Sequence, residues 1–234
     1  MFRNIALLGL VLIVTSAQVQ AEILTEEEQN QLTIARVEVK QVGGKTMMEE
    51  TNLHSKMVDL NQVDPGRVVS IARDVVALGE DIYRLVIKGK PTNTTSYAPL
   101  SIVPKVNGVA ADPFDLENFR VPVKYTYEMN YYNLYNMNVV KFRYSVIYSY
   151  GGTFNGTGAY ITGAQIVPES VKTLFGFDFS ATMKLGGIQN NGTKANPIAG
   201  ATLLLEHNVS SVMNAVTKVD TFFITGRGGF KAYK

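Results

Sequence analysis

The stretch VPVKYTYEMNY, residues 121–131, decides the fold class. From Val123 to Tyr131 every second side chain is apolar or aromatic, and lysine, threonine, glutamate and asparagine stand between them. Successive side chains of a β-strand point to opposite faces of a sheet. A period of two therefore predicts a strand with one face buried and the other in water.

The same alternation returns along the chain in segments 140–150, 175–185 and 203–213. Less regular strands are expected over 100–106, 158–167 and 219–225. Between them lie three Asn-Gly dipeptides, which favour tight hairpin turns: Asn107-Gly108, Asn155-Gly156 and Asn191-Gly192. The prediction is a mainly β protein, with an antiparallel β-sandwich of about seven strands over 98–234.

The segment before this domain has a different period. Asp64 suits an N-cap, Pro65 a first helical position and Gly89 a stop. Between them apolar residues recur at alternating spacings of three and four: Val68, Ile71, Val75, Leu78, Ile82 and Leu85. This spacing predicts a long amphipathic α-helix over 65–89 that packs on the β-domain.

Residues 22–64 form a polar N-terminal leader. Thr25 and Glu28 match a capping box, which predicts that a short helix starts there. Residues 37–40 alternate, and the sequence leaves helix and strand open for that segment.

The first 21 residues have the pattern of a signal peptide. Arg3 precedes an apolar run over 5–14, and Val19 and Ala21 suit a cleavage after residue 21. A bilayer span needs about 20 apolar residues, so this run is too short to be one. The predicted localisation is exported, either periplasmic or secreted.

Composition excludes several classes of site. The chain has no cysteine, which removes disulfides, thiol catalysis and thiolate metal ligands, and two histidines cannot form a three-histidine zinc site. Without the predicted signal peptide, 21 basic and 20 acidic side chains leave a net charge of 21 − 20 = +1, which argues against nucleic acid as a partner.

No group of residues predicts catalysis or a cofactor. The carboxylates of Asp112, Asp115 and Glu117 lack the glycine of a calcium loop. His207 follows the apolar phase of its strand, as expected of a hydrogen-bonded or edge histidine. We therefore predict a protein that is not an enzyme, with no cofactor and no metal site.

Tyrosines supply the candidate binding residues. Tyr125, Tyr127, Tyr144 and Tyr148 share the phase of the aliphatic residues, so they are expected in the core. The predicted ligand-binding residues instead lie in a hairpin connection: Tyr132, Tyr135, Asn133 and Asn136.

These observations favour an exported, non-enzymatic binding or structural protein that presents Tyr/Asn-rich loops to a protein, glycan or lipid partner. The order of elements from Asp64 onward also resembles that of actinoporins, in architecture only. That resemblance implies the alternative, a membrane-active pore-forming protein whose helix leaves the sandwich and enters lipid. A membrane surface and a second copy of the chain remain candidate partners.

Overall fold

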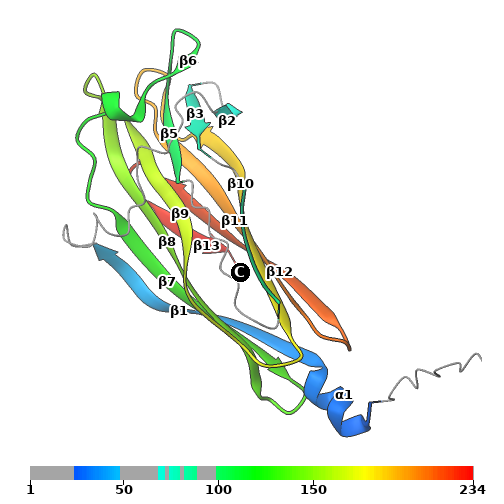
Figure 1. Ribbon diagram of the computed structural model, residues 1–234. Helices are drawn as coiled ribbons and strands as arrows, with labels where there is room; N and C mark the ends of the chain where they lie inside the picture. Colours follow the sequence, from blue (N-terminus) through cyan, green and yellow to red (C-terminus); the bar gives the residue numbers. More distant parts are fainter. Residues whose placement is uncertain (1–23, 48–67, 72–73, 80–81, 89–98, 234) are drawn as a thin grey trace, which may run out of the picture.

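The computed structural model describes residues 24–47, 68–71, 74–79, 82–88 and 99–233 (Figure 1). The predicted signal peptide and residues 48–64 of the predicted leader lie outside the described residues. The described part contains one α-helix, a 3₁₀ turn at Pro113–Asp115 and the following strands. In chain order the elements are α1 Glu26–Leu32, β1 Ile34–Met47, β2 Val68–Ile71, β3 Val75–Leu78, β4 Ile82–Lys88, β5 Leu100–Val106, β6 Val109–Ala110, β7 Val123–Asn133, β8 Asn138–Phe154, β9 Thr157–Thr173, β10 Asp178–Asn190, β11 Ala199–Ser210, β12 Ala215–Thr225 and β13 Phe230–Tyr233.

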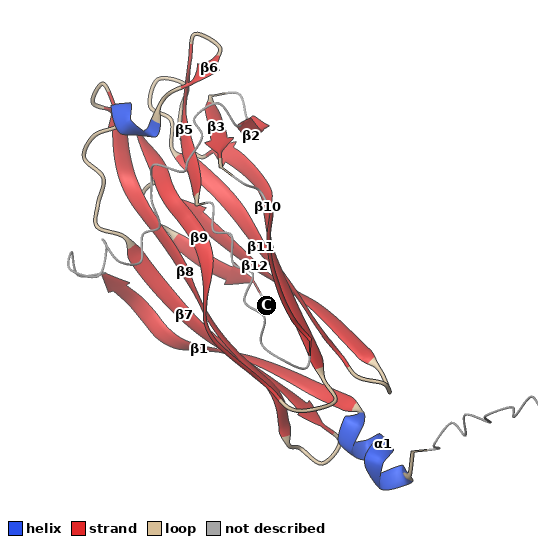
Figure 2. Ribbon diagram, in the orientation of Figure 1, coloured by secondary structure: helices blue, strands red, loops and turns tan. Residues whose placement is uncertain are grey.

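The strands form two sheets. The large sheet has the order β1-β7-β8-β9-β5-β3-β2, with β6 paired to β5, and the small sheet has the order β13-β12-β11-β10-β4. All pairings between these strands are antiparallel, and Figure 2 shows how strands dominate the molecule. The mainly β, antiparallel prediction is confirmed.

The core lies between the two sheets, where aromatic rings from both meet. Phe142 of β8 lies 4.9 Å from Phe179 of β10, and Tyr127 of β7 lies 5.3 Å from Phe222 of β12, measured between ring centroids. The four tyrosines predicted in the core are all buried, as the alternation of β7 and β8 required. Burial of such large rings supplies much of the hydrophobic stabilisation of the fold.

The predicted helix over 65–89 is wrong. Its described residues form β2, β3 and β4, and each of these strands is paired in a sheet. All four side chains of β3 are buried, so no polar face exists there. Valine and isoleucine dominate the segment and favour strands, and short apolar runs satisfy a helical spacing by chance. Gly79, between β3 and β4, has a φ of 120°, outside the helical range.

Strands are also more numerous than predicted. All seven expected strand segments are strands, but β1 to β4 come before residue 98, and the two-residue β6 and four-residue β13 are too short for a visible period. The sheets therefore include residues of β1 to β4 that lie outside the predicted β-domain of 98–234.

The N-terminal part of the described chain begins with a capped helix. The Thr25 hydroxyl accepts from the Glu28 backbone N–H at 3.2 Å, and the Glu28 carboxylate accepts from the Thr25 N–H at 2.8 Å, which confirms the capping box. The alternating residues 37–40 belong to β1, an edge strand paired with β7. The open choice between helix and strand is thus decided by pairing with a neighbour.

Two of the three Asn-Gly dipeptides form the predicted tight turns. Asn107-Gly108 and Asn155-Gly156 have positive φ at both residues and join β5 to β6 and β8 to β9. Asn191-Gly192 instead begins a longer connection over 191–198 between β10 and β11.

An ion-pair cluster on the large sheet makes its stability depend on pH. Glu169 of β9 accepts a hydrogen bond from the Ser145 hydroxyl at 2.7 Å, is paired with the Lys124 ammonium and lies 3.9 Å from Arg143. Partial burial alone would raise the pKa of Glu169, but the hydrogen bonds from Lys124 and Ser145 outweigh it and lower the pKa below its ordinary value.

A lowered folded-state pKa stabilises the protein above the unfolded value of about 4.3, and this contribution is lost as pH falls through the folded pKa. We expect Glu169→Gln to lower the acid sensitivity of unfolding. Urea unfolding between pH 3 and pH 7 should show a smaller loss of stability in the variant below about pH 4.3. Identical pH profiles for variant and wild type would contradict this account.

Candidate functional site

The predicted binding residues lie in or next to the turn between β7 and β8. Asn133 is only 2% exposed, and its side chain holds the turn together. Its Nδ2 donates to the Gln31 carbonyl of α1 at 2.8 Å, and its Oδ1 accepts from the Met137 N–H at 2.9 Å. Asn133 therefore positions the turn, and its polar atoms already have partners within the chain.

Arg36 of β1 brings two other predicted residues together. Its guanidinium carbon lies 4.0 Å from the centre of the Tyr132 ring, and it also donates a hydrogen bond to Asn136. Asn136 has a φ of 61°, which the turn requires. Tyr135 is 48% exposed whereas Tyr132 is partly buried, so Tyr135 is the more accessible of the two predicted tyrosines.

Three turns meet at the same end of the molecule, beside α1 at the lower end of Figure 1. They join β7 to β8, β9 to β10 and β11 to β12. The Leu174 N–H donates to the Val139 carbonyl at 2.9 Å, and the Ser211 hydroxyl donates to the Leu32 carbonyl of α1 at 2.6 Å. These bonds hold the turns to one another and to the helix.

This end carries an unusual concentration of exposed apolar side chains, which we call the apolar pole. Phe175 is 97% exposed and Val212 75%. Seven of the 12 large apolar side chains exposed in the described part of the chain lie here, and the pole consists of Leu134, Tyr135, Met137, Leu174, Phe175, Val212 and Met213. Such clustering marks an interaction surface, whereas single exposed apolar residues need no explanation.

The alternating pattern of the sequence did not predict that most residues of the pole are exposed. Phe175 and Met213 were placed on the apolar faces of strands 175–185 and 203–213, but both lie in turns and point to solvent. Gly176, with a φ of 87°, separates Phe175 from the strand that starts at Asp178. That glycine is the signal that a turn interrupts the alternation.

A cluster of hydrogen-bonded polar side chains is buried between the two sheets. The Tyr131 hydroxyl is 2.6 Å from His207 Nδ1, the Tyr144 hydroxyl donates to Asp220 Oδ2 at 2.6 Å, and His207 Nε2 lies 3.8 Å from the same oxygen. His207 is fully buried, as a hydrogen-bonded core histidine.

Burial and the Asp220 carboxylate raise the pKa of Tyr131 and Tyr144, and they raise that of Tyr127 to about 12. These phenols therefore stay protonated at neutral pH. The contacts of this group join β7 and β8 to β11 and β12.

The acidic loop uses one of its carboxylates as a cap. Asp112 Oδ1 accepts from the Phe114 N–H at 2.9 Å and so caps the 3₁₀ turn. Within the residues that the structure describes, no three histidine, cysteine, aspartate or glutamate side chains gather as metal ligands would. The helix of the same described part is too short and too polar to cross a membrane.

Comparisons with protein-family models, curated proteins and solved structures find no match for this chain. The functional assignment therefore rests on the geometry of the apolar pole and of the sheet surfaces.

Proposed function

We propose that this protein is an exported, non-enzymatic binding protein that contacts its partner through the apolar pole. The observation that carries this proposal is the grouping of seven exposed apolar side chains on three neighbouring turns. Burial of apolar surface is favourable by roughly 25 cal/mol per Å², so a partner that shields the pole from water stabilises the complex. Export rests on the signal-peptide pattern of residues 1–21.

Hydrogen bonds to α1 also hold two turns of the pole in place before any partner binds. Asn133 fixes the β7–β8 turn to α1, and Ser211 fixes the β11–β12 turn to the same helix. Loops that are already ordered lose less conformational entropy on binding. Tyr135 adds a polar hydroxyl at the edge of an apolar surface, a combination common at interfaces.

The charges beside the pole favour a protein partner over an anionic bilayer. Glu26, Glu27 and Glu28 form the first turn of α1 and are all exposed. Three carboxylates at this end repel anionic lipid headgroups and complement a basic rim. The partner is therefore a protein whose surface has an apolar recess bordered by lysine or arginine.

The pore-forming alternative has lost its structural premise. It required residues 65–89 to form a helix that leaves the sandwich, and the described residues of that segment are paired strands. Any contact with lipid would have to use the pole instead. Sedimentation of the pole variant with lipid vesicles distinguishes a lipid partner from a protein partner.

We expect the double variant Phe175→Ser/Val212→Ser to lose binding to the partner. Removal of two central apolar anchors costs about 2 kcal/mol or more, which is roughly thirtyfold in affinity. Cross-linking and affinity capture from the envelope and secreted fractions of the source cells, followed by titration of the captured protein, measures this effect.

The matched control is Val109→Ser/Phe114→Ser, because both exposed apolar residues belong to elements at the other end of the molecule, β6 and the 3₁₀ turn at Pro113–Asp115 (Figure 1). The control should bind like the wild type. Equal loss in both double variants, or none in either, would contradict a role for the pole. Sedimentation with phosphatidylcholine vesicles that is abolished only in the pole variant would replace the protein partner by a bilayer.

A further inference from the structure

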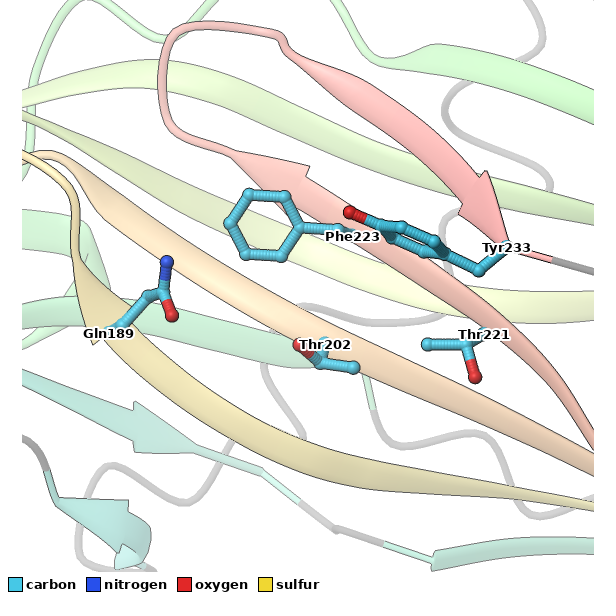
Figure 3. A pocket seen from close by; sticks show the side chains of 5 residues that line it. All are labelled: Gln189, Thr202, Thr221, Phe223 and Tyr233. Atoms are coloured by element: carbon cyan, nitrogen blue, oxygen red, sulfur yellow. The ribbon is translucent and has the colours of Figure 1, made fainter.

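A second surface feature lies away from the pole, on the outer face of the small sheet. It is an open hollow of about 460 Å³, lined by Gln189, Thr202, Thr221, Phe223 and Tyr233 (Figure 3). The lining residues come from four neighbouring strands, β10 to β13. Thr202 lies directly opposite Phe223 and Thr221 directly opposite Tyr233 in the strand pairings. The hollow is open to solvent and not enclosed, so a ligand would lie along the surface of the sheet.

The lining combines two aromatic rings with uncharged polar groups. The Gln189 amide and the hydroxyls of Thr202 and Thr221 can each donate and accept hydrogen bonds. None of the five lining side chains carries a charge at neutral pH. The Lys231 ammonium lies beside this lining, 4.7 Å from the centre of the Tyr233 ring. The lining residues themselves offer only aromatic rings and uncharged polar groups, which suit a ligand with many hydroxyl groups.

Glycine leaves the room that this hollow needs. A Cβ at Gly200 would stand 3.2 Å from the tip of the Phe223 ring and 3.2 Å from Gln189 Cγ. The absence of a side chain there lets both residues lie close to the sheet. The Gln189 amide also donates to Asn191 Oδ1, which sets its orientation. The hollow is thus shaped by the backbone as well as by its lining residues.

We propose that this hollow binds a neutral oligosaccharide. A sugar ring has an apolar C–H face and a rim of hydroxyl groups. The C–H face matches the aromatic rings of Phe223 and Tyr233, although Lys231 already lies over one face of the Tyr233 ring. The rim matches the amide and the two threonine hydroxyls. The open form of the hollow allows neighbouring sugar units to extend along the sheet. This site is independent of the apolar pole, since Thr202 lies near the end of β11 opposite to the Ser211–Asn214 turn.

Saturation-transfer NMR of the purified protein with cellotetraose, chitotetraose and maltotetraose tests the proposal, with a heparin-derived tetrasaccharide as the anionic comparison. At least one neutral tetrasaccharide should bind saturably. Phe223→Ala and Tyr233→Ala should each weaken that binding roughly tenfold, since each removes one stacking face. Phe223 is partly exposed and Tyr233 is 48% exposed, so the fold should survive both substitutions, which circular dichroism verifies.

The control on the same strand is Val219→Ala, an exposed apolar residue of β12 outside the hollow, which should bind like the wild type. The proposal is overturned if no neutral tetrasaccharide binds the wild type, if both aromatic variants bind as well as it does, or if the anionic sugar binds more tightly than the neutral ones. The pole variant Phe175→Ser/Val212→Ser should keep sugar binding, which separates a failure here from a failure of the proposed function.

Discussion

Replacing Asp220 by alanine should lower the free energy of unfolding by about 3 kcal/mol. Asp220 is buried and accepts a hydrogen bond from Tyr144, and His207 Nε2 lies 3.8 Å away. The substitution leaves the Tyr144 hydroxyl, which is fully buried, without its acceptor. An unsatisfied buried donor costs roughly 1–3 kcal/mol, and the vacated volume adds to that loss.

Thermal and urea unfolding measure this effect. For a protein of this size a loss of 3 kcal/mol corresponds to a decrease in Tm of roughly 6–12 °C. Asp220→Asn should cost less, because an amide oxygen still accepts from Tyr144.

The control is Glu206→Ala, an acidic residue of the same sheet whose partner is Lys184 at 2.7 Å on the solvent side. An exposed ion pair of this kind contributes about 1 kcal/mol at most. If Asp220→Ala costs no more than Glu206→Ala, the buried cluster does not hold the sheets together.

Replacing Gly226 by alanine should be similarly disruptive, through steric overlap. A Cβ at this position would lie 1.9 Å from the Ala159 carbonyl oxygen, which is backbone and cannot rotate away. Gly226 also donates to the Ala199 carbonyl at 2.7 Å and accepts from the Gly151 N–H at 2.8 Å. The added methyl must therefore separate β12 from the large sheet, at a cost of about 3 kcal/mol.

Gly44→Ala provides the comparison, because a Cβ there meets no heavy atom within 4 Å. This variant should change the free energy of unfolding by less than about 1 kcal/mol. Urea unfolding of both variants distinguishes overlap from a general intolerance of glycine replacement. Equal stability of the two variants would mean that the ends of the sheets can move apart without cost.

Several features of the fold were predictable from particular residues. The alternation of Val123 to Tyr131 correctly predicted a strand and the burial of Tyr125 and Tyr127. The Thr25–Glu28 pair correctly placed a helix start. These predictions hold because each depends on neighbours within one strand or one helical turn, where the sequence itself sets the geometry.

The candidate site was only partly predictable. The alternation ended near Tyr132, which indicated a turn there, but it carried no information on which other turns lie beside it. Leu174 and Val212 join Tyr135 at the pole only because β8 to β12 return the chain to the same end. The lining of the hollow depends in the same way on the register between four strands.

The sequence by itself determined the strand periodicity after residue 98, the composition of the core and the absence of cysteine chemistry. Tertiary structure decided that residues 68–71, 75–78 and 82–88 pair as strands. A short valine-rich run fits either period, and only the hydrogen-bonding edges of β5 and β10 select the extended form. Tertiary structure also decided which buried polar residues meet. Tyr144 and Asp220 are 76 positions apart, and their hydrogen bond exists only because the two sheets pack face to face.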